Sequence, residues 1–168
     1  MLGRAYKEQD CSIARSLEVV GERWTLLVLR DLSFGLSRFD ELQKSLGIAP
    51  NILTARLRRL EEEGLVERMQ YQPSPRRFAY RLTDKGLGLR PVLFYLAKWG
   101  DRHYASDLGP PRLSVHRDCG GEVDEQLACA RCGDRVSFDR IETLPGHGRE
   151  VTGSAMGAGT RPSHRRSR

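Results

Sequence analysis

The chain has 168 residues, of which 39% are hydrophobic and 30% are charged, and its formal net charge is +6. This is the balance of a globular protein, and because no apolar run reaches the roughly 18 to 20 residues that cross a bilayer, we expect no membrane-spanning segment. Residues 149–168 hold five arginines and one glutamate, which leaves +2 for the other 148 residues. Net charge is therefore a weak argument for a nucleic-acid partner, and the positions of the basic residues have to carry it.

The amino terminus has no pattern typical of a signal peptide. The segment MLGRAYKEQDCS lacks an apolar stretch and a small-residue cleavage site, so we expect a cytoplasmic protein. In a reducing compartment, cysteines are more often metal ligands or redox groups than structural disulfides.

Apolar periodicity predicts three helices in the first part of the chain. Two lie near residues 12–20 and 22–32. Ser37 and Asp40 form a Ser-x-x-Asp start signal for a third, short helix, which Gly47 ends.

A fourth helix and a hairpin complete the predicted DNA-binding unit. The helix begins at Pro50 and ends at Gly64, so that it follows the third helix after a tight turn. The segments LVERMQY and RFAYRLT are rich in β-branched and aromatic residues and flank a QPSPR turn, which predicts a β-hairpin. Together these elements predict an α+β fold, a winged helix-turn-helix.

A long fifth helix is expected after the hairpin. Thr83 can cap it, it extends from about Asp84 to Tyr104, and Pro91 is expected to kink it. Its aromatic residues exceed what one face of a small domain can bury, so we expect some of them to form a dimer interface. Its apolar stripe consists of Leu89, Leu93, Leu96 and Trp99.

The chain divides at a predicted linker around Pro110 and Pro111. Residues 1–108 are expected to form the winged-helix domain with the dimerisation helices, and 109–145 a small zinc-ribbon-like module. Residues 146–168, rich in glycine, serine and arginine, are expected to be disordered.

The fourth helix has an apolar face and a polar face. Leu53, Leu57 and Leu60 recur at helical spacing and form the buried side. Asparagine and arginine read adenine and guanine edges in the major groove, and threonine and alanine can approach a thymine methyl group or a phosphate. The residues expected to face DNA are Asn51, Thr54, Ala55, Arg58 and Arg59. The acidic run 61–63 would be repelled by phosphates, so we expect the helix to enter the groove by its amino-terminal half.

The hairpin turn supplies a second basic element. Arg76 and Arg77 follow a proline-stiffened tip and can reach the neighbouring backbone or minor groove as a wing. A single arginine is more often a solvated surface residue, and it is the ordered combination with the helix-turn-helix that favours DNA binding.

Cys11 lies at the start of the first predicted helix, where free backbone N–H groups and the helix dipole favour a thiolate. Arg15 adds to this effect and Asp10 opposes it. A redox-sensing cysteine and an inert thiol are about equally compatible with the sequence.

The carboxyl-terminal region holds four candidate metal ligands at zinc-site spacing, His116, Cys119, Cys129 and Cys132. His116 and Cys119 are separated by two residues, as are Cys129 and Cys132, and this spacing is typical of a zinc knuckle. Gly120 and Gly133 allow the tight turn that follows each pair. With EVDEQL and RVSFD as short strands, zinc would replace the core that about 30 residues cannot build. The short segment between Cys119 and Cys129 and the histidine in place of a fourth cysteine argue against a zinc ribbon. A redox-active Cys129/Cys132 pair is therefore the alternative.

Residues 10–105 resemble the HxlR-type winged-helix regulators, relatives of the MarR group. The resemblance rests on Cys11, on GERWTLLVLRDL, SRFDELQKSLGIAPNILTARLRRLEEEGLVER and RRFAYRLTDKG, and on Pro91 followed by Trp99 and Gly100. It implies a homodimer built on the terminal helices, with two recognition helices in successive major grooves of duplex DNA, and repression or activation of nearby genes. It also implies that a cysteine in the place of Cys11 senses electrophiles or oxidants in some members. A pocket for a small-molecule effector is compatible with this arrangement.

One position departs from the family pattern. Ala49 stands where a serine or threonine usually caps the recognition helix, which weakens the cap by about 1 kcal/mol. We expect the fold to tolerate this loss.

Two other classes of protein are compatible with parts of the sequence. A winged helix with a zinc ribbon can serve as a protein-interaction module, which would lack salt-dependent duplex binding. A thiol enzyme could use Cys11 or the Cys129/Cys132 pair, but neither has an orienting His/Asp pair or a phosphate loop near it in sequence. We therefore expect a regulator and not an enzyme.

Overall fold

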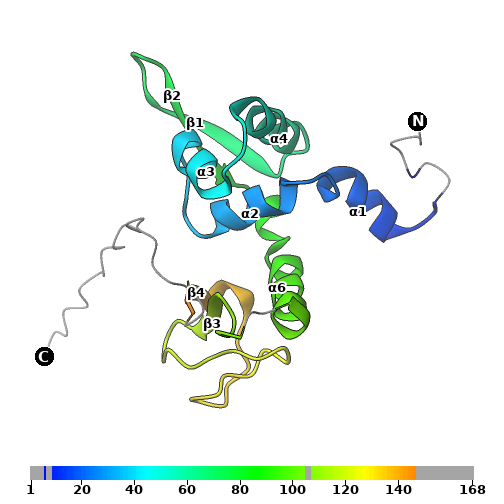
Figure 1. Ribbon diagram of the computed structural model, residues 1–168, viewed down its shortest axis with the longest axis vertical. Helices are drawn as coiled ribbons and strands as arrows, with labels where there is room; N and C mark the ends of the chain where they lie inside the picture. The colour runs from blue at the N-terminus through cyan, green and yellow to red at the C-terminus, as the bar shows by residue number, and fades with distance from the viewer. Residues whose placement is uncertain (1–5, 7–8, 105–106, 147–168) are drawn as a thin grey trace, which may run out of the picture.

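The computed structural model describes residues 6, 9–104 and 107–146. Helices dominate the first part of the chain, and short strands and turns the last (Figure 1). The elements are α1 (Ser12–Val20), α2 (Thr25–Ser33), α3 (Phe39–Leu46), α4 (Pro50–Glu62), β1 (Val66–Gln72), β2 (Arg77–Leu82), α5 (Asp84–Leu87), α6 (Arg90–Tyr104), β3 (Arg112–His116), the 3-10 helix η1 (Phe138–Arg140) and β4 (Ile141–Pro145).

The first core lies where α2, α3 and α4 pack together beside the β1–β2 hairpin. Its fully buried side chains come from all three helices, and each leucine contributes about 1.5 to 3 kcal/mol by leaving water. They are Val28, Leu29, Leu42, Leu53, Leu57 and Leu60. This core holds α4 in place with one side of the helix still exposed.

The ends of α3 and α4 are as predicted, but the start of α3 is not. Gly47 and Gly64 adopt left-handed φ values of 63° and 66°, as expected of glycines that end helices. The start of α3 differs from the prediction, because Arg38 is the cap residue and Ser37 makes no side-chain cap. The Glu41 carboxylate instead accepts hydrogen bonds from the backbone N–H groups of Ser37 (3.2 Å) and Arg38 (3.0 Å).

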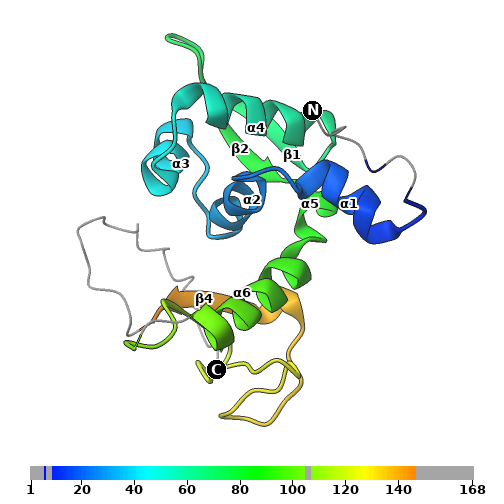
Figure 2. The same cartoon turned by 45° about the vertical axis from the view of Figure 1, so that its right-hand side comes forward.

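The hairpin pairs β1 and β2 in an antiparallel register from Val66–Leu82 onward, with an irregularity between Gln70 and Gln72. The segment before α3 joins its edge through a bridge between Arg38 and Ala79. Figures 1 and 2 show the hairpin tip extending beyond the core at the end of the molecule where α4 lies.

The single long helix predicted after the hairpin is wrong, since α5 and α6 are separate. Thr83 caps α5 as expected, with its hydroxyl accepting from the Gly86 N–H at 3.2 Å. The chain then leaves the helix at Gly88, and α6 begins at Arg90. Pro91 lies in the first turn of α6, where its missing N–H costs nothing, and so it does not kink a helix.

The carboxyl-terminal module has a different strand order from the predicted one. The paired strands are β3 and β4, which flank the cysteine loops, and β3 begins where a linker was expected. The segments EVDEQL and RVSFD form no paired strands: they contribute isolated bridges, among them Val123–Cys129 and Ala128–Arg135, and RVSFD ends in η1. The chain turns at Gly120 and Gly133, on either side of the bridge between Val123 and Cys129.

The module is packed against α6 and not against the hairpin (Figure 2). Phe94 of α6 is buried in a second core with Val123, Val136 and Ile141, and its ring meets Phe138 edge to face at 5.6 Å. Of the predicted disordered tail at 146–168, Gly146 donates its N–H to the Pro111 carbonyl at 3.0 Å, and residues 147–168 lie outside the described residues. Within the described part of the chain, no helix is both long and apolar enough to span a membrane.

Candidate DNA-binding surface and metal centre

Helix α4 presents all five of its predicted DNA-facing side chains to solvent. Leu53, Leu57 and Leu60 are buried, whereas the predicted contact residues are exposed. Those exposed residues are Asn51, Thr54, Ala55, Arg58 and Arg59. The helix therefore has the geometry that major-groove binding requires, one face in the core and the other free.

The two arginines of this face are paired within the helix. Arg58 Nε lies 2.9 Å from Glu62, and Arg59 lies 2.7 Å from Glu63. Exposed pairs of this spacing contribute only about 0.3 to 0.5 kcal/mol, so DNA can displace them. Thr54 donates its hydroxyl proton to the Pro50 carbonyl at 2.8 Å, which leaves its methyl group for contact.

Arg56 is an arginine of α4 with a different role, which the sequence analysis missed. Its Nε donates to the Arg23 carbonyl at 3.1 Å, and its guanidinium pairs with Glu22. These contacts tie α4 to the α1–α2 junction, where Trp24 holds a left-handed φ of 80°. Its position next to the buried Leu57 was the one local sign of a structural role, but its partners Arg23 and Glu22 are 33 and 34 residues away along the chain.

The wing presents Arg76 and Arg77 to solvent at its tip. Two further arginines, also missed, stack on its aromatic rings. Arg68 lies 4.4 Å from the Phe78 ring centre, and Arg38 lies 5.1 Å from that of Tyr71. Sequence could not show these contacts because they depend on the hairpin register.

Cys11 is exposed and caps α1 with an extended backbone. Arg15, which was expected to favour its thiolate, is ion-paired with Asp10. The Cys11 thiol is therefore accessible to oxidants, as a redox role requires. The charge of Arg15, however, is directed at the Asp10 carboxylate and not at the thiol.

Helices α1 and α6 expose large apolar side chains to solvent. On α1, Ile13 is 70% exposed and Leu17 is 40% exposed. On α6, the exposed side chains recur at helical spacing at Val92, Leu96 and Trp99, whereas Leu89 and Leu93 of the predicted stripe pack against the first core. Of the α6 aromatic residues, some of which were expected to form a dimer interface, Phe94 is buried against the carboxyl-terminal module, whereas Tyr95, Trp99 and Tyr104 are exposed.

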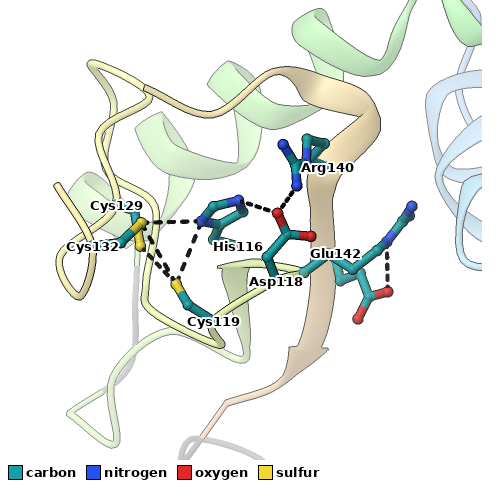
Figure 3. A network of polar contacts seen from close by, with 8 residues as sticks. His116, Asp118, Cys119, Cys129, Cys132, Arg140 and Glu142 are labelled. Carbon is teal, nitrogen blue, oxygen red and sulfur yellow. Dashed lines mark hydrogen bonds and ion pairs between the residues drawn. The ribbon is translucent and has the colours of Figure 1, made fainter. Parts of the chain in front are cut away.

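The four predicted metal ligands come together in the carboxyl-terminal module (Figure 3). Their ligand atoms all lie within 4.8 Å of one another. Cys119 Sγ lies 3.4 Å from His116 Nδ1, 3.3 Å from Cys129 Sγ and 3.7 Å from Cys132 Sγ, and Cys132 Sγ lies 3.3 Å from His116 Nδ1. A tetrahedral zinc site has N–S edges of about 3.5 Å and S–S edges of about 3.8 Å. The cluster could therefore hold a metal with little rearrangement.

Glycines shape this cluster. Gly120 and Gly133 have left-handed φ values of 73° and 76°, which confirms the predicted knuckle turns. A Cβ at Gly121 would lie 2.6 Å from Cys129 Sγ and 2.5 Å from the Arg131 Cβ. The site is closed on that side by the backbone itself.

The thiols of the cluster differ in acidity. The backbone N–H of Cys132 is the main cause that lowers the pKa of Cys129 to about 6, and the N–H of Arg131 adds to it. The pKa of Cys132 is raised to about 11, because burial and the sulfurs of Cys129 and Cys119 outweigh the opposing backbone N–H of Asp134. N–H groups aimed at sulfur are suited to a metal-bound thiolate.

A helix-turn-helix with a free basic face and a basic hairpin beside it defines the winged helix-turn-helix class of DNA-binding proteins. Residues 19–107 match the model of the HxlR-like helix-turn-helix family. The chain belongs to this family, and it is a DNA-binding transcriptional regulator. Members of the family are regulators of transcription and generally not enzymes.

Relatives extend the similarity past the winged helix. An uncharacterized HTH-type transcriptional regulator of Mycobacterium tuberculosis is 42% identical over 137 residues, which cover 82% of this chain and 87% of the relative. Residues 1–108 can supply at most 108 of these positions, so the alignment extends into the carboxyl-terminal region.

Solved structures show the same fold. The crystal structure of PA1607, assigned as a transcription factor, has 38% identity and a TM-score of 0.65, and the match covers 80% of this chain and 94% of that chain. The redox regulator HypR in its oxidized form has 31% identity and a TM-score of 0.52, and the match covers 55% of this chain and 97% of that chain.

Proposed function

We propose that the chain regulates transcription as a homodimer that binds a pseudo-palindromic duplex through two copies of α4. The observation that carries this proposal is the division of α4 into a leucine face at zero to 1% exposure and an exposed face with base-reading side chains. A dimer presents two such helices, so its two half-sites are related by the same twofold symmetry.

The charge on α4 sets the docking direction. Asn51, Thr54 and Ala55 lie in the amino-terminal half, and Arg58 and Arg59 follow, before the carboxylates at Glu61 and beyond. The amino-terminal half therefore enters the major groove, and the acidic end stays outside it. Arg76 and Arg77 at the wing tip contact the flanking phosphates.

The dimer uses the exposed apolar residues of α1 and α6. Both helices project from the core in Figure 1, and their exposed side chains include Ile13, Leu96 and Trp99. Apolar side chains of this size are costly to leave in water, which favours a covering copy of the same surface.

The module at 109–145, beyond the winged-helix domain at 1–108, holds one structural zinc ion. His116, Cys119, Cys129 and Cys132 fit a closed N1S3 site, and the metal would supply four bonds in place of a larger hydrophobic core. The expected content is about one zinc per chain by elemental analysis of protein purified under reducing, chelator-free conditions. A content near zero would favour the redox-pair interpretation of Cys129 and Cys132.

An oxidant or other thiol-reactive compound is the effector class that the structure supports. Cys11 is exposed on α1, beside the proposed interface, and the similar protein HypR is a redox regulator. We infer a cytoplasmic location, because a regulator of this family has to share a compartment with the duplex DNA that it binds.

Salt-dependent duplex binding tests the proposed function. Wild type and Arg76→Ala are titrated with a labelled duplex over a range of salt concentrations. Removal of one phosphate contact should weaken all sequences alike and lower the salt slope by about 1. Absence of salt-dependent binding in wild type would contradict the proposal and favour a protein-interaction module.

A further inference from the structure

His116 joins the metal cluster to the β3–β4 sheet. It is the last residue of β3, it pairs with Ile141 of β4, and it is only 4% exposed. Its two ring nitrogens face different partners (Figure 3). Nδ1 faces the sulfurs of Cys119 and Cys132, and Nε2 lies 3.3 Å from the carboxylate of Asp118.

Asp118 touches the cluster without belonging to it. A carboxylate that accepts the proton of one imidazole nitrogen holds that tautomer and leaves the lone pair of the other nitrogen for a metal. Here the carboxylate faces Nε2, so the lone pair of Nδ1 faces the three sulfurs. Asp118 is itself ion-paired with Arg140, which fixes its orientation.

Arg140 extends this network to α6. It precedes Ile141, whose side chain is 6% exposed and belongs to the same core as Phe94 of α6. The Ile141 carbonyl also accepts a hydrogen bond from Arg90 Nη2 of α6 at 3.1 Å. A short chain of contacts thus leads from the metal ligand through Asp118 and Arg140 to the first turns of α6.

We propose that Asp118 and Arg140 are positioning residues of the metal site, and that through them zinc affinity is linked to the docking of the module on α6. The proposal rests on the zinc site proposed above. Linkage is reciprocal, so loss of the α6 contact weakens zinc binding, and loss of zinc weakens the contact. Because α6 also carries part of the proposed dimer face, metal occupancy acts on the DNA-binding dimer.

The test measures zinc affinity in the full chain by competition with a chromogenic chelator. Asp118→Asn should raise the zinc dissociation constant about 10- to 100-fold, the usual effect of losing such an outer carboxylate. Arg140→Gln, which does not touch His116, should change it in the same direction. The matched control is Arg117→Gln, because Arg117 forms a similarly exposed pair with Glu142 at 2.9 Å that does not reach the histidine. Its affinity should stay within about twofold of wild type.

A spectroscopic measurement separates positioning from general destabilisation. Long-range 1H–15N spectra of the zinc-loaded wild type should show His116 protonated at Nε2, and that proton should exchange faster with water in Asp118→Asn. Arg90→Gln tests the linkage to α6, because it removes the hydrogen bond to the Ile141 carbonyl without changing any ligand or its carboxylate partner, and it should still weaken zinc binding.

The outcomes distinguish the two proposals. If wild type binds no zinc, the proposed metal site is wrong. If wild type binds zinc and Asp118→Asn binds equally well, or His116 is protonated at Nδ1, the metal site stands but the positioning role and the linkage through Asp118 and Arg140 are wrong. If Asp118→Asn weakens binding and Arg90→Gln does not, the linkage to α6 is wrong.

Discussion

Arg58 is the residue whose removal should most directly change base recognition. Its side chain is 79% exposed on the free face of α4 and is ion-paired with Glu62 at 2.9 Å. Breaking this pair costs about 0.3 to 0.5 kcal/mol, whereas a bidentate contact to guanine contributes about 1 to 3 kcal/mol. Arg58→Ala should therefore raise Kd for a specific duplex about 5- to 100-fold.

The assay is a fluorescence anisotropy titration of each variant with the specific duplex and with one altered at the contacted base. Wild type should discriminate the two, and Arg58→Ala should not. Glu62→Gln releases the arginine and should bind about twofold more tightly. The control is Arg117→Ala, because Arg117 is also exposed and ion-paired, with Glu142 at 2.9 Å, but lies within the carboxyl-terminal module. Equal weakening on both duplexes by Arg58→Ala would refute base reading and indicate a phosphate contact.

Three further perturbations test the other parts of the account. Gly121→Ala places a Cβ 2.6 Å from Cys129 Sγ and should lower the zinc content, whereas Gly100→Ala, whose Cβ meets nothing within 4 Å, should not. Leu96→Asp puts a charge on the exposed face of α6 and should shift the protein toward monomer in sedimentation equilibrium, and an unchanged dimer would reject this face as the interface. After oxidant treatment Cys11→Ser should keep the duplex affinity that wild type loses, and equal loss in both would assign the sensing to the carboxyl-terminal cysteines.

Local signals predicted the winged helix well. Leucine spacing located the buried face of α4, and Gly47 and Gly64 marked helix ends because left-handed φ values favour glycine. The spacing of His116, Cys119, Cys129 and Cys132 likewise identified the four side chains that cluster in the structure, since each pair spans a local turn.

Features that depend on distant contacts could not be predicted in this way. Two contacts form only after the helices and the hairpin have packed. They are the ion pair of Arg56 with Glu22 and the stacking of Arg38 on Tyr71. The break before α6 was missed because Pro91 can either kink a helix or begin one, and the sequence does not decide between them. The pairing of β3 with β4 spans the whole cysteine region and left no local pattern.

The most direct test of the central claim is selection of bound sequences from a random duplex pool by the purified protein. The account predicts an inverted repeat whose half-site centres lie about 10 to 10.5 base pairs, or a multiple, apart. It also predicts that Arg58→Ala selects the same spacing with a relaxed base at one position of each half-site. Enrichment of no motif, or of a single site without symmetry, would contradict a dimer that reads DNA with two copies of α4.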